Sequence, residues 1–232
     1  METSRQSQPS VRPPAKTRDP VATRARILLA AEREFSACGF AGTRLEAVAR
    51  RAKITKGLLF HYFPSKQAMY VAVMERIYAK LRARQDEAAL VGLGPEEGIR
   101  RLAADTFQSF LDHPEVVAMM NEENLHKARN IKGSAAIPAL YNPLIAEIRR
   151  LLAEGITEGV FRSDADPVAF YIALSGLGYF YCSNRHTLGT VFQLDLFDRH
   201  RIEEYKTLIA DMAVSYLRLQ DPPLHRQSSA VL

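Results

Sequence analysis

The chain has 232 residues, of which 47% are apolar and 25% charged, proportions typical of a soluble globular protein with a sizeable core. No apolar run approaches the ~18 residues that a bilayer-spanning helix needs, and the polar, Pro-rich start lacks the apolar segment of a secretory signal, so we expect no membrane association. The two cysteines, Cys38 and Cys182, are far apart in the sequence. This excludes a dense disulfide framework and favours a reduced, cytoplasmic protein.

The positive charge is concentrated in the N-terminal third. Residues 1–66 carry 13 Lys and Arg against 5 Asp and Glu, whereas residues 67–232 carry 18 against 21. The two parts therefore have net charges of +8 and −3, which together give the formal net charge of +5. A basic head on a slightly acidic body is typical of a nucleic-acid-binding protein, although a basic head that is simply well solvated explains the charge equally well.

The first helix is expected after a tail with little to bury. Residues 1–20 are rich in Ser, Gln, Pro and Arg and predict a disordered basic tail, for which a purely solvated role is favoured over DNA contact. Residues 21–37 predict a helix whose apolar face consists of Ile27, Leu28, Ala31 and Phe35. Gly39 suits the left-handed position that ends a helix, and Cys38 is expected to fill a small space in the core.

Residues 43–66 predict two short helices joined by a tight turn. Thr43 and Glu46 have the spacing of a capping box at the first helix start, and Thr55 is a second start signal. Pro64 ends the second helix, because the residue before a proline is disfavoured in helical geometry. Such a pair is the scaffold that places a recognition helix in the DNA major groove.

The remaining sequence predicts helices throughout. Ser65 caps a long helix that runs to about Gln85 with an apolar stripe, and this helix would connect the head to the body. The stripe consists of Met69, Val73, Ile77 and Leu81. Further helices are expected at 95–112, 114–129, 139–160, 167–186 and 198–219. The fold class is therefore all-α with about nine helices, divided into a tail 1–20, a head 21–66, a body 67–220 and a frayed tail 221–232.

The head resembles a known family. Residues 24–73, RARILLAAEREFSACGFAGTRLEAVARRAKITKGLLFHYFPSKQAMYVAV, are similar to the N-terminal domain of TetR/AcrR-family transcriptional regulators. DADPVAFYIALSGLGYFYCSN, at 164–184, is similar to a common form of the family's effector domain. The resemblance implies a homodimer that binds operator DNA, usually as a repressor, and leaves the DNA when a small ligand binds the body.

The resemblance also implies which residues contact DNA. Thr43 and Lys66 match positions that contact the phosphate backbone, and His61 and Tyr62 match a pair that touches phosphate and base. The predicted DNA-binding set is Thr43, Arg44, Lys53, Thr55, Lys56, Gly57, Leu58, His61, Tyr62 and Lys66. Many family members have Gly where this chain has Lys53, so a turn that keeps φ > 0 costs on the order of 1 kcal/mol here, unless the turn rearranges or Lys53 gains a phosphate contact.

A purely structural helical pair is the alternative for residues 43–66. That interpretation accounts for the expected head core, which consists of Leu45, Val48, Ile54, Leu59 and Phe63. It does not account for Lys56, His61 and Lys66 at one exposed end, whereas phosphate and base contacts do. DNA binding is therefore the favoured interpretation of residues 43–66.

The body predicts a ligand pocket and a dimer surface. Candidate pocket residues are Phe107, Met119, Met120, Asn124, Tyr141, Tyr171, Ser175 and Tyr179, although core packing explains each one singly. The apolar run in 167–186 exceeds what one core face needs, which predicts a self-pairing four-helix bundle. Its expected interface residues are Tyr179, Phe180, Ser183, Ile202, Tyr205, Ile209 and Met212.

No catalytic constellation is apparent in the sequence. Glu122 and His126 have helical i, i+4 spacing without a second ligand pair, so a surface hydrogen-bonded pair is favoured over a metal site. No metal and no cofactor are expected. Three functions stay open at this stage: a ligand-responsive DNA-binding regulator, which is favoured, a DNA-binding regulator without a small-molecule effector, and a helical enzyme.

Overall fold

The computed structural model describes residues 19–83, 90 and 92–219, and the described part is all-α, as predicted. The head is made of α1 (Pro20–Gly42), α2 (Leu45–Arg51) and α3 (Lys56–Tyr62), and α4 (Lys66–Ala83) leads from it. The body adds α5 (Pro95–Asp112), α6 (Pro114–Leu125), α7 (Ala136–Thr157), α8 (Pro167–Phe192) and α9 (Arg199–Leu217). Nine helices thus lie in the described ranges, with an isolated bridge between Phe161 and Arg218.

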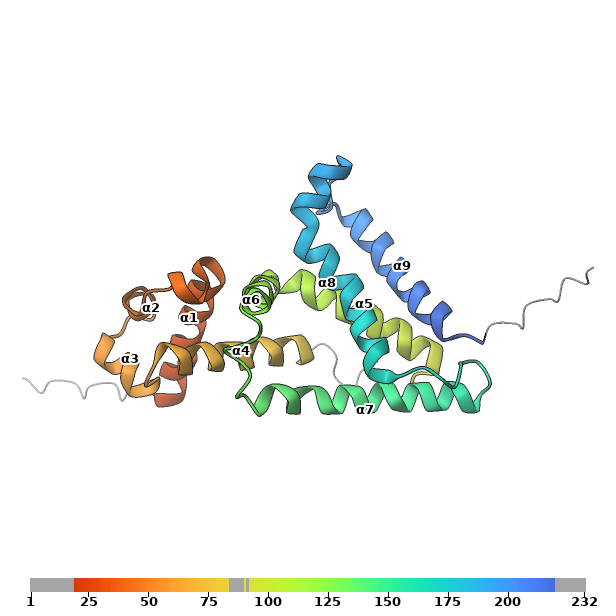
Figure 1. Cartoon of the computed structure of the whole chain (residues 1–232), viewed down its shortest axis with the longest axis horizontal. Coiled ribbons are helices and arrows are strands. Elements are labelled where there is room, and N and C mark those ends of the chain that lie inside the picture. The colour runs from red at the N-terminus through yellow and green to blue at the C-terminus, as the bar shows by residue number, and fades with distance from the viewer. Residues whose placement is uncertain (1–18, 84–89, 91, 220–232) are drawn as a thin grey trace, which may run out of the picture.

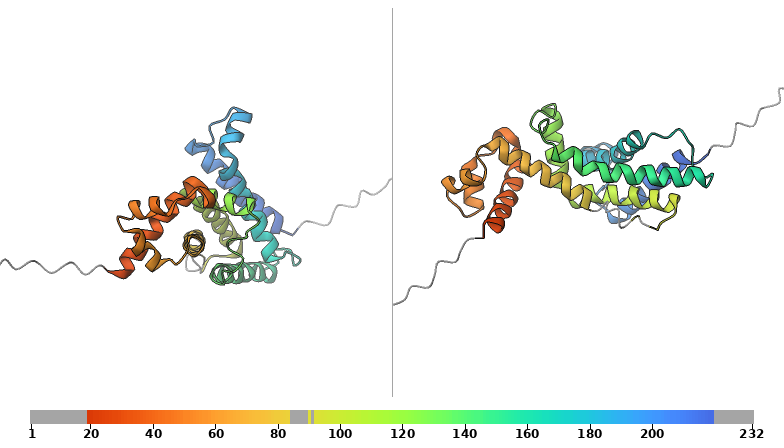
Figure 2. Two further views of the ribbon diagram at one scale, coloured as in Figure 1. Left: turned by 60° about the vertical axis from the view of Figure 1, so that its left-hand side comes forward. Right: turned by 90° about the horizontal axis from the view of Figure 1, so that it is seen from below.

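The helices form an elongated molecule with the head at one end (Figure 1). α4 runs from the head into the body, where α7 lies alongside it, and α8 and α9 rise together on the opposite side of the body (Figures 1 and 2). Most of the predicted tails, 1–20 and 221–232, and the end of the long helix near Gln85 lie outside the described residues. No described helix is both long and apolar enough to cross a membrane.

Short polar side chains start several helices where the sequence predicted them. The hydroxyl of Thr55 accepts a hydrogen bond from the Leu58 amide at 3.2 Å, and the hydroxyl of Ser65 accepts one from the Ala68 amide at 3.0 Å. Asp198 caps α9 in the same way, through the Arg201 amide at 3.1 Å. These caps satisfy amides that have no partner within the helix, and they fix the start of each element.

The predicted capping box at Thr43 is wrong. α1 continues past Gly39, which kinks it with φ 66°, and ends at Gly42. The Thr43 hydroxyl donates back to the carbonyls of Gly39 (2.8 Å) and Glu34 (3.1 Å), and the Thr43 amide donates to the Gly39 carbonyl at 3.3 Å. Thr43 therefore closes α1, and Arg44 is the N-cap of α2 without a side-chain bond.

Other helix boundaries also differ from the prediction. α6 ends at Leu125 rather than at 129, because Lys127 and Ala128 take positive φ angles that break the helix. α7 begins at Ala136, so Pro138 falls in its first turn, where its missing amide costs nothing. α8 extends to Phe192 rather than to 186. Cys38, which was expected in the core, is exposed.

One continuous core joins the head to the body along α4. The predicted stripe Met69, Val73, Ile77 and Leu81 is at most 1% exposed along its whole length. At the head end, the rings of Phe35, Phe40 and Tyr70 meet edge to face or stacked, with centroids 5.0–6.2 Å apart. α4 is therefore a shared structural element rather than a linker.

A buried charge network reinforces the junction of head and body. Glu32 on α1 is 4% exposed and accepts hydrogen bonds from Arg76 (3.1 Å) and Lys80 (2.5 Å) on α4. Lys80 also donates to Glu115 of α6 at 2.8 Å. Burial alone would lower the pKa of Lys80, but its bonds to Glu115 and Glu32 outweigh burial and raise it. The three helices are thus joined by charge as well as by apolar contact.

Replacing Lys80 by Met should lower the free energy of unfolding by roughly 2 kcal/mol, because Glu32 then stays buried with Arg76 alone and Glu115 loses its lysine. Chemical and thermal denaturation measure this loss. The pair between Lys206 and Glu203 offers a matched control, because the Glu203 side chain is 59% exposed against 5% for Glu32, so Lys206→Met leaves no carboxylate buried and should change the melting temperature little. Equal effects of the two substitutions would contradict a structural role for the network.

Candidate functional site

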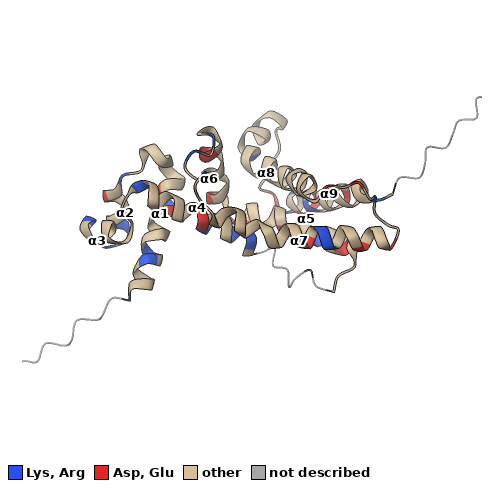
Figure 3. Cartoon of the chain, turned by 60° about the horizontal axis from the view of Figure 1, so that its bottom comes forward, with Lys and Arg blue, Asp and Glu red and all other residues tan. Residues whose placement is uncertain are grey.

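The first candidate surface is the exposed side of α2 and α3 at the tip of the head. α3 buries Leu59 completely in the head core, and Lys56, Gly57 and His61 remain exposed. Lys and Arg occur along α1, α2 and α3 (Figure 3). A short, capped helix that exposes cationic and hydrogen-bonding side chains has the geometry of a major-groove reader.

The turn before α3 keeps a left-handed residue at Lys53. Lys53 has φ 54°, its amide donates to the Arg50 carbonyl at 3.1 Å, and the Ile54 amide donates to the Ala49 carbonyl at 3.0 Å. This bond pair is the Schellman motif, which ends helices most often with glycine at the left-handed position. The turn therefore has not rearranged around the lysine, and Lys53 carries the strain that the sequence predicted.

Lys56 pairs with Glu46, which was expected instead to complete a capping box with Thr43. Its ammonium donates to Glu46 of α2 at 2.6 Å and lies 5.9 Å from the ring centroid of Phe60. The hydrogen bond from Lys56 lowers the pKa of Glu46, which stays ionised. Both side chains are more than half exposed, so the pair is weak and Lys56 can exchange Glu46 for a phosphate.

The other predicted DNA contacts differ in availability. Thr43 is 3% exposed and its hydroxyl is turned inward, so this conformation does not present it to a phosphate. Lys66 is partly buried, donates to the Ala41 carbonyl at 3.2 Å and lies over the Phe40 ring, which leaves donors free at the head surface. Arg44 and Thr55 are exposed. Leu58 and Tyr62 are partly exposed on α3, and the Tyr62 ring lies edge to face against His61.

The second candidate site is a cluster of aromatic side chains around Arg82 in the body, formed by Tyr78, Arg82, Tyr141 and Tyr171 and called the tyrosine chamber, with Ser175 one helical turn beyond Tyr171 on α8. Arg82 of α4 donates from Nη2 to the Tyr171 hydroxyl of α8 at 2.6 Å. Its guanidinium carbon lies 4.4 Å from the ring centroid of Tyr141 on α7 and 5.2 Å from that of Tyr171. The Tyr141 ring also lies 5.9 Å from the Tyr78 ring and 6.0 Å from the Tyr171 ring.

The polar atoms of the tyrosine chamber are incompletely satisfied. Nε and Nη1 of Arg82 and Oγ of Ser175 are enclosed and have no hydrogen-bond partner among the described residues. Burial raises the pKa of Tyr141 and, to a smaller extent, that of Tyr78, so both phenols stay neutral. Enclosed donors without acceptors are costly, which marks this chamber as a candidate binding site.

The structure brings together two of the predicted ligand residues, Tyr141 and Tyr171, and Ser175 lies one helical turn beyond Tyr171 on α8. Tyr179 instead donates to Asn121 and packs against Phe110. Phe107 is fully buried against Tyr181 and Tyr205, Met119 is fully buried, Met120 is partly buried, and Asn124 is exposed. The sequence analysis missed Tyr78 and Arg82, whose i, i+4 spacing beside the apolar stripe of α4 was the available signal.

Glu122 also has a role that its spacing from His126 did not indicate. Nδ1 of His126 lies 2.9 Å from the Glu122 carbonyl oxygen, so the two residues are in contact as expected. The Glu122 carboxylate, however, accepts a hydrogen bond from the Phe40 amide at 3.1 Å. A side chain at Gly39 would lie 2.8 Å from Oε1 of Glu122, so glycine allows this close approach of α6 to the kink of α1.

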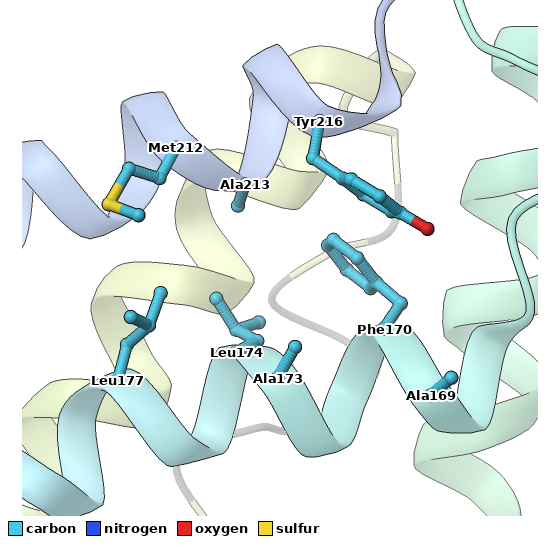
Figure 4. A pocket seen from close by; sticks show the side chains of 8 residues that line it. All are labelled: Ala169, Phe170, Ala173, Leu174, Leu177, Met212, Ala213 and Tyr216. Atoms are coloured by element: carbon cyan, nitrogen blue, oxygen red, sulfur yellow. The ribbon is translucent and has the colours of Figure 1, made fainter.

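The third candidate surface is an apolar face formed by α8 and α9. A groove of about 350 Å³ separates the two helices there, with Phe170, Leu177, Met212 and Tyr216 among its lining residues (Figure 4). Six apolar side chains of this face are 45–65% exposed. They are Val168, Ile172 and Phe180 on α8 and Leu208, Met212 and Tyr216 on α9. An apolar face of this extent is typical of a protein–protein contact.

The predicted interface residues only partly coincide with this face. Phe180 and Met212 lie on it, whereas Ile209 is 1% exposed in the protomer's own core, so its assignment to the pairing surface is wrong. Tyr205 donates to the Leu177 carbonyl at 3.1 Å, Ser183 donates to Asn121 at 3.1 Å, and Ile202 is partly buried. Ile172, Leu208 and Tyr216 were missed, although 208, 212 and 216 have helical i, i+4, i+8 spacing.

Replacing Lys53 by Gly should raise the free energy of unfolding by up to about 1 kcal/mol, because glycine takes the left-handed conformation without strain. Denaturation midpoints measure the gain. The same substitution at Arg50, which is in regular helix, should destabilise the head and serves as the control. A loss of stability in Lys53→Gly would show that the lysine side chain stabilises the turn.

Comparison with known proteins agrees with this architecture. Residues 27–73 match the profile of "Bacterial regulatory proteins, tetR family", and residues 95–213 match "Tetracyclin repressor-like, C-terminal domain". The chain is 34% identical over 196 residues to the HTH-type transcriptional repressor NicS of Pseudomonas putida, covering 84% of this chain and 92% of NicS. It is 33% identical to the HTH-type transcriptional regulator RutR of Escherichia coli over 132 residues, 55% of this chain and 56% of RutR.

A solved structure shares the whole fold. SCO4942 of Streptomyces coelicolor superposes with a TM-score of 0.62 at 22% identity, over 82% of this chain and 97% of that one. The head that exposes α3, the helical body and the two profile matches agree, and none of them indicates an enzyme. The chain belongs to the TetR family of bacterial transcriptional regulators, with an N-terminal helix-turn-helix domain and a C-terminal helical domain.

Proposed function

We propose that the protein is a homodimeric repressor that binds a near-palindromic operator through α3 and leaves it when a small molecule enters the body. The observation that carries the proposal is the end of α3, where Lys56, Gly57 and His61 are all exposed. The name of NicS, a repressor, supports the sign of regulation. Operator DNA in a bacterium lies in the cytoplasm, which is where the protein would act.

The face of α8 and α9 is the proposed dimer surface. A single head reads half an operator, whereas a two-fold dimer presents two α3 helices to half-sites about one helical turn, roughly 34 Å, apart. Pairing of this face with its copy would cover Ile172, Phe180 and Met212 in a four-helix bundle.

Two physical connections would carry a ligand signal to the head. α4 begins at Lys66, which is bonded to the end of α1, and reaches Arg82 in the tyrosine chamber. The two positions are 16 residues apart, about 24 Å at 1.5 Å per residue, and belong to one rigid helix. The second connection is the bond from the Phe40 amide to Glu122, which ties α6 to the kink of α1.

A DNA-binding regulator without a small-molecule effector is the alternative. The enclosed guanidinium atoms of Arg82 disfavour it, because a body that served only as scaffold would gain from a fully apolar interior. A gel shift with DNA from upstream of the protein's own gene tests operator binding. Release of that DNA by a metabolite separates the two alternatives.

Replacing Glu46 by Gln should tighten operator binding several-fold at low salt, because it removes a negative charge near the phosphates and frees Lys56. Lys56→Ala should weaken binding and reduce the slope of log affinity against log salt by about 1. Fluorescence anisotropy across salt concentrations measures both. Glu203→Gln on α9 is the charge-matched control and should leave binding unchanged. Full affinity and slope in Lys56→Ala would remove that lysine from the contact set.

Replacing Ile172 by Asp should convert the dimer to a monomer and abolish tight operator binding, because a carboxylate would be buried without a partner in the bundle. Sedimentation at micromolar concentration measures the first effect and the gel shift the second. Leu125→Asp is the control, since Leu125 is an exposed apolar residue of α6 away from this face. A monomeric wild-type protein, or a dimeric Ile172→Asp variant, would refute pairing through this face.

A further inference from the structure

The tyrosine chamber holds a guanidinium with too few acceptors. Tyr171 supplies an acceptor to Nη2 of Arg82, and Nε and Nη1 have none among the described residues, although both atoms are enclosed. Burying a charged donor without an acceptor costs more than burying a neutral one. A sequence selected for stability alone would place an apolar side chain at position 82, so the charge is explained better by a ligand.

Other arginines of the body show how this chain normally satisfies a guanidinium. Each of the following donates to a carboxylate at 2.5–3.0 Å: Arg100 to Asp211, Arg150 to Glu147 and Glu154, Arg162 to Asp164, and Arg218 to Glu96. Arg82 makes no such pair among the described residues and contacts tyrosines instead. Among the described residues, therefore, no carboxylate neutralises Arg82, and this is the pairing that an anionic ligand would supply.

The shape of the chamber restricts that anion. The ring of Tyr141, 4.4 Å away, and the ring of Tyr171 lie against the guanidinium, so an acceptor must approach the edge on which Nε or Nη1 lies. A carboxylate oxygen suits such an in-plane approach. Ser175, one helical turn beyond Tyr171, has an enclosed hydroxyl that can donate to a second oxygen. The aromatic groups around Arg82 are the rings of Tyr78, Tyr141 and Tyr171, against which a flat ligand ring packs well.

The charges around the chamber favour a monoanion. The nearest carboxylate on α6, Glu123, faces Tyr70 and Tyr78 and raises their pKa values, after burial itself. Glu123 is buried, and its carboxylate accepts hydrogen bonds from the amide (2.8 Å) and the side chain (2.8 Å) of Asn130. A phosphate dianion would have only one cation, Arg82, to balance its two charges and would also lie near the Glu123 carboxylate. A ligand with one carboxylate carries a single charge, which Arg82 balances.

We propose that the tyrosine chamber binds a small aromatic carboxylic acid in its carboxylate form, with Arg82 as the counter-ion, Ser175 as a further donor and the rings of Tyr78, Tyr141 and Tyr171 as walls. The inference deepens the proposed ligand response by giving the effector a chemical class. Its binding step is independent of DNA and is tested without DNA.

Benzoate is the probe, and the full-length protein is titrated by calorimetry and thermal shift. Benzoate should bind saturably and raise the melting temperature, and benzamide, which has the same shape without charge, should bind at least tenfold more weakly. Cyclohexanecarboxylate tests whether the ligand ring must be flat, and inorganic phosphate tests whether the anion must be a carboxylate. Both should bind more weakly than benzoate. Equal binding of benzoate and benzamide, or tighter binding of phosphate, would overturn the proposal.

Arg82→Met should reduce benzoate affinity at least tenfold. The control is Arg101→Met, which removes an exposed arginine paired with Asp105 and should leave benzoate binding unchanged. Arg82→Lys keeps the charge but not the planar donor fork, and it should fold even if the methionine variant does not, with affinity reduced but measurable. Benzoate affinity that is unchanged in both Arg82 variants would exclude Arg82 as the counter-ion.

Operator release is measured separately by adding benzoate to the gel shift. Benzoate binding with no effect on the operator complex would uphold this inference and refute the proposed ligand response. Operator binding in a protein that binds no carboxylate would refute this inference and leave the DNA-binding function standing.

Discussion

The burial of α4 is the constraint on which the rest of the structure depends. One face of this helix, from Met69 to Leu81, is closed off from water by the head at one end and by the body at the other. Close-packed interiors deform little, so a displacement at one end of a helix buried in this way appears at the other. The charge network of Glu32, Lys80 and Glu115 adds a directional contact in the last turn of the same helix.

This arrangement places both proposed binding sites on one rigid element. Lys66 begins α4 beside the exposed surface of the head, and Arg82 lies near its described end among the tyrosines. In the proposed dimer, the apolar face of α8 and α9 would set the distance between two copies of that element. A change in the tyrosine chamber would then alter the spacing of the two heads without any change inside either head.

The sequence predicted the parts of the fold that depend on neighbouring residues in the chain. The stripe of α4 and the caps at Thr55 and Ser65 were confirmed, because each depends on residues close together in the chain. Of the alternatives open for the turn at Lys53, the left-handed one is found. The head surface was also predictable, since a family resemblance supplied fixed offsets around Lys56 and His61.

The errors concern interactions between distant segments. Thr43 has the spacing of an N-cap, but the kink at Gly39 supplies better acceptors for its hydroxyl. Ile209 has the periodicity of a surface stripe, yet α9 turns that side toward its own core. Arg82 was not among the predicted site residues, because only the approach of α7 and α8 encloses it. Periodicity identifies an apolar face, but it does not say which neighbour covers that face.

The free energy that a regulatory response needs is no larger than one hydrogen bond to Arg82 would supply. A ligand shifts an equilibrium only by the difference in its affinity for the two states. A tenfold loss of operator affinity needs about 1.4 kcal/mol, and a hydrogen bond to a charged group contributes about 1.5–3 kcal/mol. One contact with Arg82 that is well formed in the released state and poorly formed in the DNA-bound state is therefore sufficient. Because such coupling is reciprocal, bound operator DNA must lower the affinity for the ligand by the same factor.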